Sequence, residues 1–274
     1  MRYLITGGTG SFGQAMTKKL LVNGHDVAVL SRGEHAQHDM AQSLIGFEER
    51  VRFFIGDVRD RSRLRRAFDG CDVVLHAAAL KRIEVGFYNP SEMVATNVLG
   101  AVNVIEACKD AGVGRCVFLS TDKAWQPVSA YGYSKALAET LFLNAYQKGT
   151  GTEFVATRYG NVWKSAGSVV PKWLSFMDQG IRRLPVTDPD ATRFFMTMGE
   201  ATELVYNASR HPPTGKVVIP HLPAYRLGDV VDALTGEMEI IGMEPWEKKH
   251  EGMSAELTSD IVRRMTIEEI RSHL

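Results

Sequence analysis

Short runs of apolar residues alternate with amphipathic stretches along the first part of the chain. The runs are rich in Val, Ile, Leu and Phe, and they cover residues 3–7, 26–30, 51–56, 72–79, 115–120 and 153–160. This composition is typical of strands that are buried on both faces of a parallel sheet. The stretches between them predict helices, most clearly over residues 11–23, 88–112 and 131–148. Alternation of this kind predicts an α/β protein with a doubly wound parallel sheet.

The pattern changes after Asn161. Further elements are predicted there, with helices over 167–180, 198–210, 226–235 and 266–273 and strands over 215–220 and 238–242. Together they describe a smaller C-terminal α/β lobe. We therefore expect two parts, residues 1–161 and residues 162–274. The boundary between them is soft, because the chain can cross back between lobes in such folds.

The segment TGGTGSFG, residues 6–13, follows the first predicted strand and opens the first predicted helix. Its glycines let the backbone turn tightly and approach a pyrophosphate closely, and the helix N-terminus offers free N–H groups and a positive dipole end. In this context the loop predicts a Rossmann-like dinucleotide-binding unit, with a purely structural turn as the alternative. Its candidate cofactor residues are Gly7, Thr9, Gly10, Ser11, Phe12 and Gly13.

The end of the second predicted strand favours NADP over NAD as the cofactor. A carboxylate at this point would bind the 2′-hydroxyl of NAD, whereas this chain has Ser31 and Arg32. An arginine can pair with a 2′-phosphate through its planar guanidinium group. The alternative is that Arg32 is a solvated loop residue or stacks on adenine, which leaves NAD open. The ends of the third and fourth strands add the candidate cofactor residues Asp57, Val58, Ala77, Ala78 and Ala79.

Tyr131 and Lys135 are candidate catalytic residues and candidate cofactor contacts. They lie four residues apart on a predicted helix, and residues with this spacing are neighbours. A lysine beside a tyrosine, with a nicotinamide ring nearby, lowers the pKa of the phenol, so Tyr131 can act as a base on a sugar or alcohol hydroxyl. Thr121 ends the preceding strand, where ligands bind in such sheets, and is a candidate to hydrogen-bond the same hydroxyl.

Composition excludes several classes of protein. The 274 residues carry a formal net charge of zero, so we do not expect a nucleic-acid binder, which would show a basic excess. The three cysteines are widely spaced and flanked by apolar residues, which favours buried thiols in a reducing compartment over disulfides or a metal site. No apolar run approaches the length of a membrane span, and the chain begins with a predicted strand rather than a signal peptide. We therefore expect a soluble cytoplasmic protein.

Six segments together resemble the extended short-chain dehydrogenase/reductase superfamily: TGGTGSFG, GDVRD, HAAALK, STDKA with YGYSK downstream, RYGNV with GSVVP, and TRFF. More narrowly, they resemble the nucleotide-sugar 4,6-dehydratases of bacterial polysaccharide biosynthesis. The branch they are most similar to acts on UDP-N-acetylglucosamine, often with inversion at C5. The motifs run from residue 3 to about residue 251. The resemblance implies a bound NADP, a nucleotide-sugar substrate and a homo-oligomer that associates through the long helices at 88–112 and 131–148.

The resemblance implies a redox-neutral cycle. Oxidation at C4 gives a 4-keto sugar and acidifies the C5 hydrogen, a base then removes that hydrogen while an acid protonates the departing C6 hydroxyl, and hydride returns to C6. Lys123 is the candidate C5 base and Asp122 the candidate C6 acid. An ammonium beside a carboxylate tends to stay charged, so Lys123 needs desolvation to serve as a base. A surface ion pair without a catalytic role is the alternative for these two residues.

The resemblance also implies substrate contacts. Lys81 and Asn97 match residues that line the sugar and cofactor cleft, so Lys81 is a candidate for both ligands. Contacts to the nucleotide side of the substrate are implied for Asn161, Ser168 and Arg193, and Glu247 keeps the frame of a further motif. A solvated position is the alternative for Lys81 and Arg193. For Asn97 the alternative is a structural hydrogen bond to the backbone.

Three residues depart from the pattern of the family. Trp125 stands where a small residue is usual, so a bulky ring either reshapes the pocket or packs under the loop. Ala166 and Glu244 stand where arginines are usual, which removes positive charge from the nucleotide side. A 4-epimerase of the same superfamily and a non-catalytic NADP-binding regulator are the competing functions. Neither of them needs the adjacent acid and amine of Asp122 and Lys123.

Overall fold

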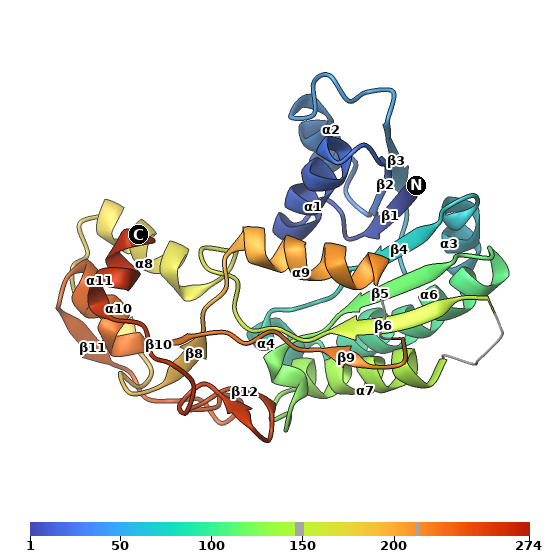
Figure 1. Ribbon diagram of the computed structural model, residues 1–274. Helices are drawn as coiled ribbons and strands as arrows, with labels where there is room; N and C mark the ends of the chain where they lie inside the picture. Colours follow the sequence, from blue (N-terminus) through green and yellow to red (C-terminus); the bar gives the residue numbers. More distant parts are fainter. Residues whose placement is uncertain (146–150, 212–213) are drawn as a thin grey trace.

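The computed structural model describes residues 1–145, 151–211 and 214–274. Its main layer is a seven-stranded sheet in the order β3-β2-β1-β4-β5-β6-β9, and every neighbouring pair is parallel (Figure 1). This order reverses between β1 and β4, as in doubly wound dinucleotide-binding folds. The predicted fold class is therefore confirmed. The strands are β1 Arg2–Thr6, β2 Asp26–Ser31, β3 Val51–Ile55, β4 Val73–His76, β5 Arg115–Leu119, β6 Glu153–Thr157 and β9 Val217–Val218.

Alternating side chains of the central strands build two cores, one on each face of the sheet, because successive residues of a strand point to opposite sides. Tyr3 and Ile5 of β1 belong to the core under α1 (Ser11–Val22) and α9 (Met198–Arg210), whereas Leu4 belongs to the opposite core. That second core is covered by helices of the 61–145 region, namely α3 Arg61–Phe68, α6 Gly100–Asp110 and α7 Ala130–Ala145. Burial on both faces explains why the strands read as continuous apolar runs.

The helix predicted over 88–112 is confirmed as a continuous helical run over residues 90–110, and a break at Asn89 separates this run from a short helix before it. The structure has α4 (Ile83–Tyr88) and then three short successive segments, α5 Pro90–Met93, the π-helical η1 Val94–Leu99, and α6. Pro90 accounts for the break, since it lacks an N–H group and disfavours helical backbone in the residue before it. Asn89 accordingly leaves the helical region, with φ −131° and ψ 56°.

The smaller lobe lies beside the carboxyl ends of the sheet strands (Figure 1). Its own core includes Val170, Trp173, Leu184 and Phe195. The sequence pattern assigned the strand at 215–220 to this lobe, but β9 is instead the seventh strand of the main sheet. The chain thus crosses back after the first lobe segment, and a division at residue 161 stays a proposal. The lobe elements are α8 Val169–Asp178, β7 Leu184–Val186, β8 Thr192–Phe194, β10 Ala224–Arg226, α10 Leu227–Leu234, β11 Met238–Ile240, β12 Gly252–Ser254, β13 Leu257–Thr258 and α11 Ile267–Ser272.

The helices in the described part of the chain are each too short or too polar to cross a bilayer.

The remaining helix beside the sheet is α2, Glu34–Gln42, which follows β2.

Gly13 offers a test of the packing at the start of α1. A Cβ atom at this position would lie 2.4 Å from both the Cα and the carbonyl oxygen of Gly8, and backbone cannot move aside as a flexible side chain can. We predict that Gly13→Ala lowers the free energy of unfolding by at least about 1–3 kcal/mol, the usual cost of overpacking. Gly33→Ala is the matched control, because its new Cβ would meet only Ala36 Cβ at 3.8 Å. Denaturant unfolding of both variants measures the effect, and equal stabilities would contradict the prediction.

Candidate active site

The glycine loop and the fourth strand form a close backbone cradle. Gly7 has φ +68°, and a Cβ atom there would lie 2.9 Å from the backbone nitrogen of Ala78. Only glycine therefore allows the loop after β1 to touch the segment Ala77–Ala79 after β4. Gly10 precedes α1, and no side chain caps the helix there. Free N–H groups at an uncapped helix start suit a pyrophosphate, so this cradle fits the dinucleotide that the sequence predicts.

The residues at the predicted ribose end of the cradle differ in burial and in hydrogen bonding. Ser31 is buried and its Oγ accepts a hydrogen bond of 2.9 Å from Gln37, whereas Arg32 is exposed. Burial opposes ionisation of Asp57, but hydrogen bonds from Arg59 outweigh it and lower the pKa of the carboxyl. The side chain of Val58 is buried in the core. Of these four residues, Arg32 is thus the one whose exposed positive charge could pair with a phosphate.

A short 3-10 turn, η2 (Asp122–Ala124), follows β5 and carries the adjacent acid and amine. Thr121 caps the turn: its Oγ1 accepts from the backbone N–H of Lys123 and donates to Asp122 Oδ1 at 2.9 Å. Asp122 is fully buried, and its Oδ2 atom has no hydrogen-bond partner within the described residues. Burial is the main reason why the pKa of Asp122 is raised, which favours the protonated acid. The pair is therefore not a solvated surface ion pair.

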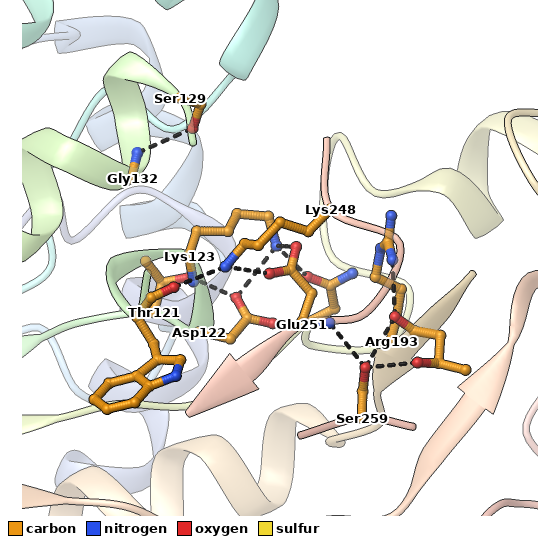
Figure 2. A network of polar contacts seen from close by, with 12 residues as sticks. Thr121, Asp122, Lys123, Ser129, Gly132, Arg193, Lys248, Glu251 and Ser259 are labelled. Carbon is orange, nitrogen blue, oxygen red and sulfur yellow. Dashed lines mark hydrogen bonds and ion pairs between the residues drawn. The ribbon is translucent and has the colours of Figure 1, made fainter. Parts of the chain in front are cut away.

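The Nζ atom of Lys123 is surrounded by oxygen atoms (Figure 2). It lies 3.2 Å from Asp122 Oδ1, 3.2 Å from Asn161 Oδ1 and 3.1 Å from Glu251 Oε1. Burial alone would lower the pKa of this ammonium group. The carboxylates of Asp122 and Glu251 outweigh burial and raise the pKa well above its usual range. The resting site thus holds Lys123 as a cation.

The first turn of α7 packs directly on η2. Gly132 makes this possible, since a Cβ atom there would lie 2.5 Å from the carbonyl oxygen of Lys123. Tyr131 consequently lies near the charged pair and is half-buried, and desolvation raises its pKa to about 12 although the nearby Lys123 opposes the rise. The sequence predicted Lys135 as the cation that acts on Tyr131. Lys123 also lowers the pKa of Tyr131, and the role of Lys135 stays a prediction.

Lys135 faces the end of β5. Its Nζ donates to the carbonyl of Leu119 at 2.6 Å and lies 3.9 Å from the centre of the Phe118 ring. Burial lowers the pKa of Lys135 to about 7, and Glu139 on the same helix counters this only in part. A lysine with such a pKa sits poised between its charged and neutral forms near neutral pH.

A pocket of about 110 Å³ opens beside Lys123. It brings together three of the predicted site residues besides Lys123, namely Asn161, Arg193 and Glu247. Arg193 is held in place by hydrogen bonds from its Nη1 to the carbonyls of Thr192 (2.8 Å) and Lys249 (3.0 Å). The other residues that line the pocket are Ile83, Val128, Ser129, Trp246, Lys248 and Glu251.

The remaining predicted substrate residues lie outside this pocket. Asn97 is buried, and its amide binds both backbone groups of Leu80 (2.8 and 2.9 Å) as well as Ser134 Oγ (2.9 Å). It thus holds the loop after β4, which agrees with the structural alternative rather than with a substrate contact. Lys81, in that loop, donates to the Ala166 carbonyl at 2.9 Å, and burial lowers its pKa. Ser168 precedes α8, and its buried Oγ has no partner in the described structure.

Two site residues escaped the sequence analysis, Glu251 and Lys248. Glu251 is only 3% exposed and bridges two cations, with Oε1 3.1 Å from Lys123 and Oε2 3.0 Å from Lys248. Burial opposes its charge, but the nearby cations, Lys123 first among them, lower its pKa to about 2. The only signal in the sequence was the segment EPWEKKHE, whose last residue is Glu251. Nothing in that segment alone pairs it with Lys123.

Trp125 packs under the segment that carries these residues and does not line the pocket. A Cβ atom at position 252 would lie 2.7 Å from Trp125 Cδ1, so Gly252 rests on the indole. Lys248 Nζ donates to the Trp125 carbonyl at 2.8 Å, and the Arg158 guanidinium lies 5.6 Å from the indole centre. Of the two expectations for Trp125, packing under the loop is the one the structure shows.

Comparisons with known proteins identify the family of the chain. The family model described as "Polysaccharide biosynthesis protein" matches residues 3–271. A UDP-N-acetylglucosamine 4,6-dehydratase (inverting) of Campylobacter jejuni is 42% identical over 91% of this chain and 76% of its own length. A UDP-glucose 4-epimerase of Rickettsia conorii is 38% identical, with coverage of 91% and 76%. The solved structure of Pen from Bacillus thuringiensis is 30% identical with a TM-score of 0.93, over 99% of this chain and 97% of that one. The resemblance predicted from the motifs is confirmed.

The contact between Gly252 and Trp125 predicts an energetic coupling. Gly252→Ala would force β12 away from the indole and with it Glu251 away from Lys123, because the new Cβ has no room. We expect a loss of stability of about 1–3 kcal/mol, the usual cost of overpacking. In the Trp125→Ala background the same change should cost clearly less, since the indole that obstructs the Cβ is gone. A double-mutant cycle by denaturant unfolding measures the coupling, and strictly additive effects would refute the contact.

Proposed function

The chain belongs to the polysaccharide biosynthesis protein family, and from that premise we propose that it is a nucleotide-sugar 4,6-dehydratase, a hydro-lyase that works with a bound nicotinamide dinucleotide. The observation that carries the proposal is the buried Asp122–Lys123 pair, with a separation of 3.2 Å, packed against the helix start that holds Tyr131. Hydride exchange needs only the tyrosine and the lysine of that helix. An additional acid and amine in the same site suit the loss of water.

We assign the cofactor to the cradle of the glycine loop and the Ala77–Ala79 segment. The bound nicotinamide supplies the hydride acceptor and donor. Tyr131 would act as the phenolate: its phenol would first release its own proton to solvent, favoured by Lys123 and by the cationic nicotinamide ring, and would then take the proton of the sugar O4 hydroxyl. Thr121 would orient that hydroxyl. Lys135, with a pKa near 7, would add a tunable positive charge at this point. Arg32 favours NADP over NAD, because its guanidinium group is exposed at the end of β2.

The elimination step assigns one proton to each member of the pair. Lys123 as the free amine takes the C5 proton, and Asp122 as the carboxylic acid gives its proton to the C6 hydroxyl, which leaves as water. The observed ion pair carries the same total number of protons, and one transfer across 3.2 Å converts it into the working form. Burial of Asp122, which raises its pKa, favours that transfer, and the contact with Glu251 opposes it.

Protons balance over the whole cycle. Lys123 returns its proton to C5 when hydride arrives at C6, so the amine is restored. Asp122 is left without the proton that departed in water, and Tyr131 holds the one from O4. Thr121 donates to Asp122 at 2.9 Å and is near enough to Tyr131 to lower the pKa of its phenol. We therefore assign to Thr121 the return of this proton from Tyr131 to Asp122.

We propose UDP-N-acetylglucosamine as the substrate, with inversion at C5. The relative from Campylobacter jejuni, with that activity in its name, supports this choice. Asn161, Arg193 and Glu247 line the pocket beside Lys123 and would contact the substrate there. The nucleotide end would also meet Lys81 and Ser168, with less positive charge than the family pattern has because of Ala166 and Glu244.

A 4-epimerase is the competing function, and the name of the Rickettsia relative supports it. Epimerisation needs Tyr131 and Lys135 but no proton transfer at C5 or C6. The burial of Asp122 and its contact with Lys123 therefore favour dehydration over epimerisation. A regulator that only binds NADP would need none of these four groups.

We further propose a homo-oligomer. Large apolar side chains are exposed along the helices on one side of the sheet, including Phe87, Tyr88, Leu99, Tyr133 and Leu137. They belong to α4, η1 and α7, in the same region from which the family resemblance implies association. Exposed apolar residues gathered on neighbouring elements are typical of a protein interface.

Lys123→Ala should abolish dehydration, because the substrate then has no base at C5. We predict a fall in kcat of about 10²–10⁴-fold, the usual contribution of a general base, with NADP still bound. The assay is incubation with UDP-N-acetylglucosamine and mass spectrometry of the product, in which loss of about 18 Da marks dehydration. Lys249→Ala is the matched control, since Lys249 pairs with Asp188 at 3.0 Å and does not line the pocket. A product of unchanged mass would point to the epimerase, and turnover of Lys123→Ala near that of wild type would remove the assigned base.

Arg32→Ala should weaken NADP binding about tenfold or more while NAD binding changes little. The physical reason is that the guanidinium group would pair with the 2′-phosphate, which NAD lacks. Dissociation constants for both dinucleotides, measured by calorimetry on wild type and variant, give the comparison. Equal losses for NADP and NAD would rule out the 2′-phosphate contact.

A further inference from the structure

A row of alternating charges runs through the site, from Lys248 through Glu251 and Lys123 to Asp122 (Figure 2). Successive members lie 3.0, 3.1 and 3.2 Å apart. All four side chains are largely withdrawn from water, with exposures of 16%, 3%, 19% and 0% along the row. Water therefore screens these charges poorly, and each one acts strongly on the next.

Hydrogen bonds within the smaller lobe hold the backbone of Glu251. The backbone N–H of Glu251 donates to Ser259 Oγ at 2.9 Å, and the Ser259 N–H donates to the Glu251 carbonyl at 2.8 Å. Ser259 is itself tied to Thr192 in β8 through a contact of 2.6 Å between their hydroxyls. The backbone of Glu251 is thus anchored in the smaller lobe independently of Lys123.

The outer cation is also fixed. Lys248 Nζ binds the Trp125 carbonyl at 2.8 Å in addition to Glu251, so it belongs to the segment that rests on Trp125. One carboxylate is therefore shared by two ammonium groups, and one ammonium group by two carboxylates.

We propose that Glu251 and Lys248 together set how readily Lys123 becomes a base. Glu251 holds Lys123 as an ammonium ion in the resting site, and Lys248 weakens that hold because it attracts the same carboxylate. Glu251 acts through Lys123, so it is a positioning residue. The inference rests on the proposed function for its catalytic meaning, but the charge relation itself does not depend on catalysis.

The signs follow from the groups that face Lys123. Asp122 and Glu251 favour the ammonium form, Arg193 disfavours it, and the Tyr131 hydroxyl is neutral near pH 7. Removal of the Glu251 charge lowers the pKa of Lys123, so more of the free amine is present at a given pH. Removal of the Lys248 charge leaves Glu251 unopposed and raises the pKa of Lys123, so less free amine is present. Removal of the Glu251 charge and removal of the Lys248 charge thus shift the pKa of Lys123 in opposite directions.

Competitive acetylation measures the fraction of Lys123 present as the free amine, because only the free amine reacts. Wild type, Glu251→Gln and Lys248→Met are treated with a trace of acetic anhydride at pH 9, and acetylation of Lys123 is quantified by peptide mass spectrometry relative to that of the exposed Lys18. We expect the relative rate at Lys123 to rise about tenfold or more in Glu251→Gln, which corresponds to a pKa lower by one unit. In Lys248→Met it should fall severalfold below wild type. Glu256→Gln and Lys249→Met, which make the same charge changes nearby, should leave the rate within twofold of wild type.

The outcomes separate this inference from the proposed function. Equal Lys123 rates in Glu251→Gln and Glu256→Gln overturn the inference, even if the protein proves to be a dehydratase. Opposite shifts in the two row variants support it, even if no nucleotide sugar is dehydrated and the proposed function falls. If Glu251→Gln unfolds, Lys248→Met decides alone, since it leaves Glu251 and its backbone contacts in place. A rate in Lys248→Met equal to that in Lys249→Met then overturns the inference.

Discussion

The close approach of α7 to the turn after β5 is the constraint on which the site depends. Gly132 has no side chain, and the Lys123 carbonyl occupies the space that a Cβ atom would need. Through this contact the helix that carries Tyr131 and Lys135 meets the turn that carries Asp122 and Lys123. The groups that we propose for hydride exchange and those that we propose for proton transfer therefore lie together. Any larger residue at position 132 would separate the two sets.

Charges buried in that volume are stable only because they alternate. An isolated ammonium group or carboxylate withdrawn from water would lose its charge, since burial disfavours the ionised form. Lys123 nevertheless stays cationic and Glu251 anionic, because each has partners of opposite sign at about 3 Å. Asp122 is the weak member of the row, with its second oxygen unpaired in the described structure and its pKa raised. Of the two carboxylates in the row, Asp122 therefore accepts a proton more readily than Glu251, and it lies next to the Lys123 amine.

The sequence predicted the features that depend on local pattern. The buried strands, the glycine loop and the four-residue spacing of Tyr131 and Lys135 each follow from neighbouring residues, and the structure contains all of them. The helix predicted over 88–112 also follows from local pattern, and the structure has a helical run over residues 90–110. Glu251 and Lys248 were not readable, because their meaning comes from pairing with Lys123 across the two lobes. The same holds for Asn97, whose burial against Leu80 is a matter of tertiary packing.

The charges of Asp122, Lys123 and Glu251 act on Tyr131 as well as on one another. Lys123 lowers the pKa of Tyr131, whereas Asp122 and Glu251 raise it. A proton that moves within the Asp122–Lys123 pair therefore changes the electric field at the Tyr131 phenol, which is the base in the proposed hydride step. An enzyme that only exchanged hydride would gain nothing from such a coupling. In a dehydratase the coupling is useful, because the proton lost by Asp122 has to be recovered from Tyr131 before the next cycle. Thr121, which donates to Asp122 and affects the pKa of Tyr131, is the residue we propose for that exchange.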